Sequence, residues 1–80
     1  MYLFVEVSID ASGIGRNIRL LMQQHHLTVS ELARRIGVNE STVRRWRNGQ
    51  VVPEPKNAMA LSKLFGVPID TFIAHHETCM

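Results

Sequence analysis

The side chains whose type and spacing most clearly suit binding are five arginines in one short stretch of the chain. They are Arg34, Arg35, Arg44, Arg45 and Arg47, accompanied by the carboxylates of Glu31 and Glu40. The local net charge is therefore +3, whereas the whole chain of 80 residues carries +2. Guanidinium groups bind phosphates and guanine edges through paired hydrogen bonds. Because attraction to a polyanion depends on where charge is concentrated, the cluster is compatible with a polyanionic partner and equally with a solvated helical face.

The other reactive side chains do not form a recognised catalytic or metal site. The histidines occur as adjacent pairs, His25–His26 and His75–His76, and neighbours on a helix point in different directions. Cys79 is the single cysteine, so an internal disulfide is impossible and a reducing compartment fits. No serine lies in a nucleophile elbow, and so short a chain has little room for a deep cleft. We therefore expect no enzyme activity, no metal and no cofactor.

The start of the chain alternates between apolar and polar residues. One face of this segment carries Leu3, Val5, Val7 and Ile9. Such alternation predicts a half-buried β-strand over residues 2–10. Glu6 and Asp10 interrupt the apolar character and no basic segment precedes it, so we expect neither a signal peptide nor a membrane span. A cytoplasmic protein without a membrane partner is the expectation.

Helical periodicity follows, after Ala11-Ser12-Gly13, which we expect to end the strand. The first helix carries its apolar residues at helical spacing from Ile14 to Met22. A second helix begins at Thr28, a predicted N-cap with Glu31 as its capping-box partner. It ends at Gly37, a residue type that tolerates left-handed backbone.

Three more short helices are predicted. The third spans residues 40–47, with Asn39 as its N-cap and with Val43 and Trp46 facing inward. The fourth begins near Pro55 and ends at Gly66, and Pro68 opens a brief fifth with Phe72 turned inward. The expected fold is mainly α: five helices in a domain of residues 13–74, preceded by a β-strand arm of residues 1–12 and followed by a polar tail of residues 75–80.

The most informative feature is the pair of short helices joined by Gly37-Val38-Asn39, with the small residue Ala33 one turn before the glycine. This combination permits a close, steep helix crossing. Here the chain resembles the XRE family of phage repressor and Cro-like helix-turn-helix proteins over about residues 14–73. The resemblance is carried by Ile14-Gly15, Ile18-Arg19, Leu21, Leu27-Thr28, Glu31-Leu32-Ala33, Ile36-Gly37-Val38, Ser41-Thr42-Val43, Asn48-Gly49, Pro53 and Leu64-Phe65-Gly66-Val67.

The resemblance implies a repressor-type regulator that binds double-stranded DNA, usually as a homodimer on a two-fold operator. The family's base-reading positions fall on Glu40, Ser41 and Arg45, with Arg44 beside them. Arginine can donate to guanine, glutamate can accept from cytosine, and serine is permissive. Glu40 has an alternative role as a first-turn carboxylate that favours the helix dipole.

Phosphate contacts are expected at helix N-termini and in the loop after the third helix, because exposed backbone N–H groups bind anions. The candidates are Thr28, Ser30, Asn48, Gln50 and Lys56. Asn48 has an alternative role as a helix C-cap.

Three residues depart from the family pattern. Val29 occupies a position where the family often has a glutamine that touches phosphate. Met22 and Arg47 stand where many members pair an arginine with a glutamate, which leaves Arg47 available for phosphate. His26 replaces the glycine that commonly ends the first helix.

The sequence leaves two kinds of protein partner open, a second copy of the chain and a different protein. A lone strand leaves its backbone unpaired, so the strand of another copy is the expected partner, with Leu3, Val5, Val7 and Ile9 covering the first helix near Leu20. Pairing with residues 75–80 of the same chain, or a dimer through the fifth helix around Phe72, are the alternatives. The competing function is an antitoxin or adaptor module whose main partner is another protein, for instance a toxin.

Overall fold

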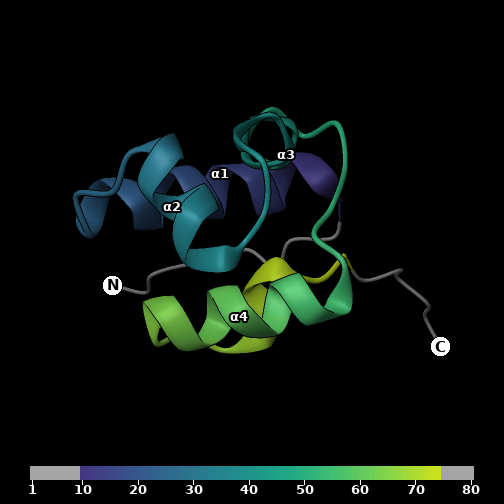
Figure 1. Cartoon of the computed structure of the whole chain (residues 1–80). Helices are drawn as coiled ribbons and strands as arrows, with labels where there is room; N and C mark the ends of the chain where they lie inside the picture. Colours follow the sequence, from purple (N-terminus) through teal and green to yellow (C-terminus); the bar gives the residue numbers. More distant parts are fainter. Residues whose placement is uncertain (1–9, 75–80) are drawn as a thin grey trace, which may run out of the picture.

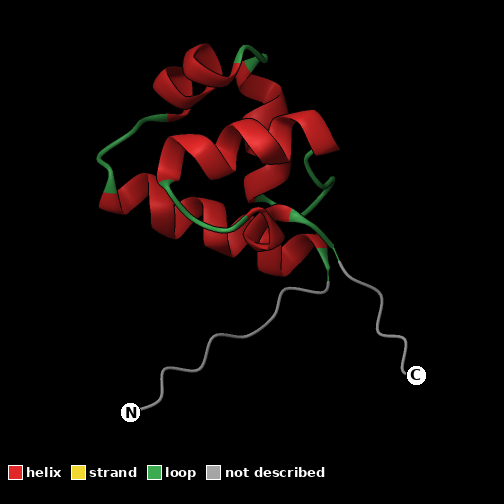
Figure 2. Ribbon diagram, turned by 90° about the horizontal axis from the view of Figure 1, so that it is seen from below, coloured by secondary structure: helices red, strands yellow, loops and turns green. Residues whose placement is uncertain are grey.

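A computed structural model describes residues 10–74 and shows four α-helices followed by one 3₁₀-helix. The α-helices are α1 (Ala11–Gln24), α2 (Val29–Ile36), α3 (Glu40–Arg47) and α4 (Pro55–Phe65), and the 3₁₀-helix η1 is Ile69–Phe72. In Figure 1, α1, α2 and α3 occupy the upper half of the molecule and α4 lies beneath them. Figure 2 shows that every regular element of the described residues is helical. The predicted mainly helical fold is confirmed.

The first helix begins earlier than the sequence predicted. Residues 2–9 of the predicted strand lie outside the described residues, and Asp10 is the N-cap of α1. Its carboxylate accepts a hydrogen bond of 2.9 Å from the N–H of Gly13. This cap satisfies a backbone donor in the first turn, so Ala11 and Ser12 belong to the helix. The first helix therefore begins two residues before the predicted start of the helical domain at residue 13.

Gly15 has a packing role inside α1. A Cβ at this position would lie 2.5 Å from the carbonyl oxygen of Trp46 and 2.7 Å from that of Arg47. Only a residue without a side chain allows the backbone of α1 to approach the end of α3 so closely. The glycine thereby fixes how α3 sits on α1.

The turn geometry around α2 agrees with the sequence analysis. Thr28 and Glu31 form the predicted capping box, and Gly37 ends the helix with a φ of 87°. The N–H groups of Gly37 and Val38 both bond to the carbonyl of Ala33, at 2.8 and 3.0 Å. His26 adopts a left-handed backbone with a φ of 56°, so it takes the conformation that the family usually gives to glycine.

The start of α3 differs from the prediction in one detail. Asn39 is the N-cap residue, but its side chain makes no capping hydrogen bond. The N–H of Thr42, which a capping side chain would normally engage, is already bonded to the Asn39 carbonyl at 3.0 Å. The asparagine therefore acts through its backbone alone.

The predicted fifth helix is a single 3₁₀ turn. The N–H of Thr71 bonds to the carbonyl of Pro68 at 3.0 Å, and Ile73 is already extended, with a φ of −116°. The turn is tied to α1 by Asn17, whose Nδ2 donates to the Thr71 carbonyl at 3.1 Å. Phe72 is fully buried as predicted.

All four α-helices contribute to one core. Its buried apolar residues are Ile14, Ile18, Met22, Leu32, Ala33, Val43, Trp46, Ala58, Leu61, Phe65 and Phe72. Trp46 is the largest of them and is 1% exposed. In this core α3 packs against both α1 and α2, which leaves the opposite face of α3 open to solvent.

Candidate nucleic-acid interface

The exposed face of α3 collects the residues predicted to read bases. Val43 and Trp46 are buried, whereas Glu40, Ser41, Arg44 and Arg45 are all exposed. The buried and the exposed residues alternate at helical spacing. Because one face of the helix is buried in the core, the other face lies in solvent. The structure therefore brings the four candidates together on two turns of one helix.

Two of these residues already contact each other. The guanidinium of Arg44 donates to the Glu40 carboxylate at 3.2 Å, one helical turn away. An exposed pair of this kind contributes about 0.3–0.5 kcal/mol. Glu40 thus has a role besides the helix dipole, and the pair is weak enough to open for a ligand.

Arg45 is the least constrained cation of this face. It is exposed and forms no ion pair within residues 10–74. The guanidinium can therefore turn toward a partner without losing an existing contact.

The N-terminus of α2 is capped by its own side chains and has two backbone N–H groups without an acceptor among the described residues. The Thr28 hydroxyl accepts from the Glu31 N–H at 3.1 Å, and the Glu31 carboxylate accepts from the Thr28 N–H at 2.9 Å. The Thr28 N–H and hydroxyl both donate to the Glu31 carboxylate, and these two bonds, together with the charges of Arg34 and Arg35, lower the pKa of Glu31. The N–H groups of Val29 and Ser30 have no acceptor among the described residues. Ser30 is exposed, so its backbone and hydroxyl are both accessible.

The loop after α3 presents two further candidates. Asn48 is the C-cap of α3, and its N–H bonds to the carbonyl of Arg44. The alternative role of this residue as a helix C-cap is therefore confirmed. Gln50 follows Gly49, which has a φ of 78°, and its N–H bonds to the carbonyl of Arg45 at 2.9 Å. Both side chains are exposed.

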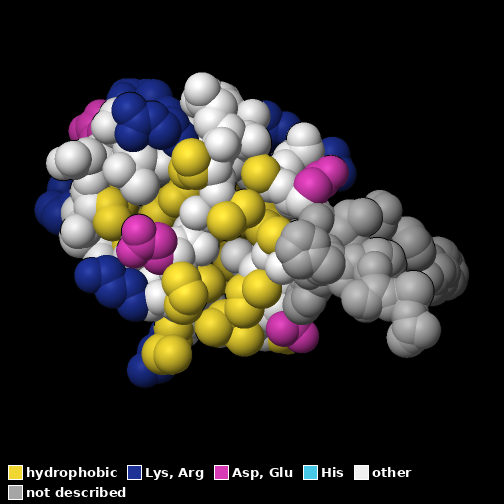
Figure 3. Space-filling view, turned by 90° about the vertical axis from the view of Figure 1, so that its right-hand side faces the viewer, with side chains coloured by type: hydrophobic (Ala, Val, Ile, Leu, Met, Phe, Trp, Pro, Cys, Tyr) yellow, Lys and Arg dark blue, Asp and Glu magenta, His cyan; other side chains and the backbone are white. Residues whose placement is uncertain are grey.

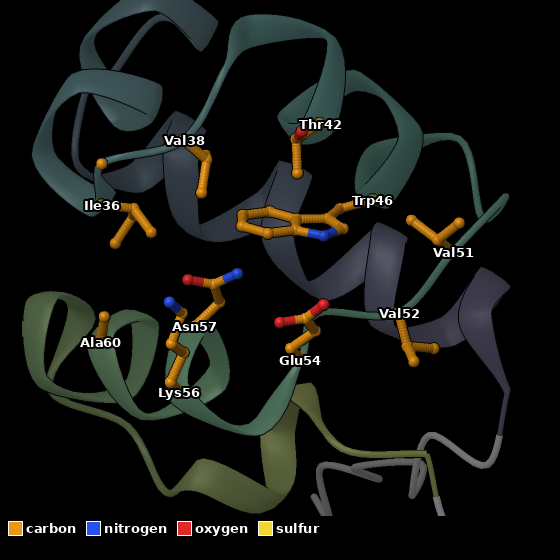
Figure 4. A pocket seen from close by; sticks show the side chains of 11 residues that line it. Ile36, Val38, Thr42, Trp46, Val51, Val52, Glu54, Lys56, Asn57 and Ala60 are labelled. Carbon is orange, nitrogen blue, oxygen red and sulfur yellow. The ribbon is translucent and has the colours of Figure 1, made fainter.

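Lys56 lies apart from these residues, at the start of α4. It borders a groove of 620 Å³ between the α2–α3 turn, α3 and α4. Figure 4 shows the Trp46 indole in this groove, with Val38 and Thr42 on one side of it and Glu54 and Asn57 on the other. The groove carries charges of both signs and does not include Thr28 or Arg47.

Arg47 is partly buried, unlike the other arginines of α3. It lines a second hollow, of 430 Å³, together with Thr28, Met22 and two arginines of α1, Arg16 and Arg19. The sequence analysis did not single out these two residues. Their spacing of three, on the polar face of the first helix, is the signal that could have found them.

The surface also carries apolar side chains. Figure 3 shows hydrophobic side chains in the middle of the face that bears the α3–α4 loop, with Lys and Arg side chains along its upper rim. The exposed large apolar residues among those described are Leu20, Val51, Val52 and Met59. Leu20, the described member of the predicted dimer interface, is 52% exposed. The other members, Leu3, Val5, Val7 and Ile9, lie outside the described residues.

Within residues 10–74, no helix is both long and apolar enough to cross a bilayer. Over the same range, no group of three His, Cys, Asp or Glu side chains is placed to hold a metal ion.

Known proteins share both the sequence pattern and the fold. The helix-turn-helix family model HTH_3 matches residues 18–72. An uncharacterized HTH-type transcriptional regulator of Methanocaldococcus jannaschii is 32% identical over 53 residues, which are 66% of this chain and 80% of that protein.

Two solved structures are similar in fold. The restriction-modification controller protein C.AhdI from Aeromonas hydrophila has a TM-score of 0.70 at 21% identity, covering 79% of this chain and 96% of that one. The SOS-response transcriptional repressor LexA from Eubacterium rectale has a TM-score of 0.74 at 21% identity, covering 89% of this chain and 77% of that one. The family match spans more than half of the chain, and α2, the Gly37 turn and α3 form its helix-turn-helix. The chain therefore belongs to the XRE-type helix-turn-helix family of DNA-binding transcriptional regulators.

Proposed function

We propose that the chain is a sequence-specific repressor whose α3 enters the major groove of double-stranded DNA. The observation that carries the proposal is the exposed face of α3, which bears Glu40, Ser41, Arg44 and Arg45 opposite the buried Val43 and Trp46. A major groove admits one α-helix, and base edges are read there by hydrogen bonds. The family is generally non-enzymatic, in keeping with a binding role.

The side chains of this face suit a site that contains G·C pairs. Arg45 and Arg44 can each donate two hydrogen bonds to O6 and N7 of guanine, and Glu40 can accept from N4 of cytosine. Ser41 can bond to several bases. Reading by Arg44 and Glu40 requires their ion pair to open, which costs only about 0.3–0.5 kcal/mol because both groups are exposed.

Phosphate contacts flank this face. Ser30 and Thr28 stand at the N-terminus of α2, and Asn48 and Gln50 follow α3. Arg47 supplies charge at the end of α3, and Lys56 supplies charge from the start of α4, apart from the others. Because such contacts release counterions, affinity should fall steeply with salt concentration.

The repressor acts as a homodimer in this proposal, so that two copies of α3 reach successive major grooves about 34–36 Å apart. The N-terminal segment with Leu3, Val5, Val7 and Ile9 is the proposed contact. It would cover α1 near Leu20, whose side chain is 52% exposed. Deletion of residues 2–9, which keeps the Asp10 cap, should give a monomer in sedimentation analysis. A truncated protein that remains dimeric would favour the turn around Phe72 as the interface.

Selection of bound duplexes from a random pool tests the function directly. The expected product is a two-fold-symmetric site, and placing that site over a promoter should lower transcription of a reporter when the protein is present. Selection that returns no preferred sequence would contradict the proposal and favour a module whose main partner is another protein.

A further inference from the structure

Three polar side chains at the start of α4 face the groove between the α2–α3 turn, α3 and α4. They are Glu54, Lys56 and Asn57, and Figure 4 shows them below the indole of Trp46. Glu54 and Lys56 have opposite charges, but residues two positions apart do not face each other on a helix surface. Neither of them forms an ion pair within residues 10–74. Both charges therefore remain available to a molecule that enters the groove.

Trp46 adds a donor without a partner at the same place. The residue is only 1% exposed, yet its indole N–H makes no hydrogen bond to any residue that the structure describes. Figure 4 shows the indole nitrogen on the edge of the ring that is turned toward Glu54 and Asn57. A buried indole N–H usually finds an acceptor. The groove thus combines this donor with two opposite charges, which suits a ligand that carries both an anionic acceptor and a cation.

An apolar wall adjoins these polar groups. Ile36 at the end of α2, Val38 in the turn and Ala60 of α4 lie together at one end of the groove in Figure 4. An aliphatic group gains free energy against such a wall because its surface is removed from water. The volume of 620 Å³ falls within the range of about 300–1,000 Å³ that is typical of small-molecule sites. A small ligand with a charged head and an aliphatic side chain matches this distribution.

We propose that the groove binds an α-amino acid with an aliphatic side chain. The ammonium group of the ligand faces the Glu54 carboxylate, and its carboxylate faces Lys56 and the indole N–H of Trp46. Its side chain lies against Ile36 and Val38. None of the base-reading candidates of α3 lines the groove, so this ligand and DNA use different faces of that helix. The inference goes beyond the proposed function and does not depend on it.

The emission of Trp46 tests the inference, because this residue is the single tryptophan of the chain and lines the groove. L-leucine, added to the full chain without DNA, should change the emission saturably and raise the melting temperature. Two analogues keep the aliphatic group and remove one charge each: 4-methylpentanoate lacks the ammonium group, and 3-methylbutylamine lacks the carboxylate. Each analogue should bind about two- to fivefold more weakly than leucine, the effect of one exposed ion pair.

Two variants assign the charges to residues. Glu54→Gln should no longer distinguish leucine from 4-methylpentanoate, and Lys56→Met should no longer distinguish leucine from 3-methylbutylamine. Glu54 makes no side-chain capping bond to α4, so its replacement removes no hydrogen bond from the fold. Lys63→Met is the matched control for Lys56→Met. It removes the same charge from an exposed position in the last turn of α4, outside the groove, and should keep the wild-type affinities.

The result that would overturn the inference is a wild-type chain whose emission and melting temperature both stay unchanged with leucine. Equal affinities for leucine and the two analogues would overturn it as well, because the groove would then not recognise the paired charges. So would a Glu54→Gln variant that still prefers leucine to 4-methylpentanoate as the wild type does. Each of these results leaves the proposed function standing, since DNA is absent from the titrations.

Discussion

Replacement of Gly15 by alanine should separate α1 from the end of α3 and destabilise the domain. The added Cβ would meet the carbonyl oxygens of Trp46 and Arg47 at 2.5 and 2.7 Å, whereas real Cβ contacts below 3.0 Å are essentially never seen. Both neighbours are backbone atoms, so no side-chain rotation relieves the overlap. The helices must instead separate by about half an ångström or more against a closely packed core.

The size of the effect follows from two opposing terms. Overpacking of this kind destabilises by about 1–3 kcal/mol, and the backbone overlap places Gly15→Ala near the upper end. Alanine is a better helix former than glycine by about 1 kcal/mol, which offsets part of the loss. The net destabilisation is then about 2 kcal/mol, or roughly 8–16 °C in the melting temperature of a domain of this size.

Thermal unfolding followed by circular dichroism measures this shift. Gln24→Ala, an exposed change at the end of the same helix, is the control and should stay within about 0.5 kcal/mol of the wild type. If Gly15→Ala melts at or above the wild-type temperature, the close approach of α1 and α3 does not constrain the fold and the reasoning fails.

Three other variants probe recognition, the core and the cap. Arg45→Ala should weaken binding to the preferred operator by about 1–3 kcal/mol and leave a scrambled duplex nearly unaffected, whereas equal losses in gel-shift titrations would make Arg45 a phosphate contact. Trp46→Ala should lose about 3–5 kcal/mol of the roughly 5–15 kcal/mol that hold such a domain together, and a normal melting temperature with weak DNA binding would instead place Trp46 at the interface. The pKa of Glu31 is lowered in the folded chain, so its bonds to Thr28 stabilise the fold above its ordinary pKa of 4.5 and lose this effect as pH falls through the lowered value. The melting temperature of Glu31→Ala should therefore lie below the wild type at pH 7 and approach it in acid, and an equal gap at both pH values would contradict this assignment.

The helix-turn-helix was predictable because its signals are local. The Thr28 and Glu31 pair lies within one helical turn, and Gly37 marks a backbone position that strongly favours glycine. The burial of Val43 and Trp46 follows from the period of a single helix.

The features that the sequence analysis missed depend on contacts between distant segments. In the sequence, Gly15 is only a weak helix former. Its packing role depends on the end of α3, which lies far away in the sequence. Arg16 and Arg19 look like ordinary solvated residues of the first helix, and only the fold brings them to the hollow that Arg47 lines. Asp10 fits an alternating strand pattern equally well, and its capping bond to Gly13 decides the local conformation.

The charge of the hollow and the packing of α1 on α3 are parts of one arrangement. Gly15 lets α1 approach the carbonyls of Trp46 and Arg47, and the next residue along α1 is Arg16, at the edge of the hollow that Arg47 shares. Arg16 and Arg19, three residues apart, repel each other by about 0.2–0.5 kcal/mol in the free protein.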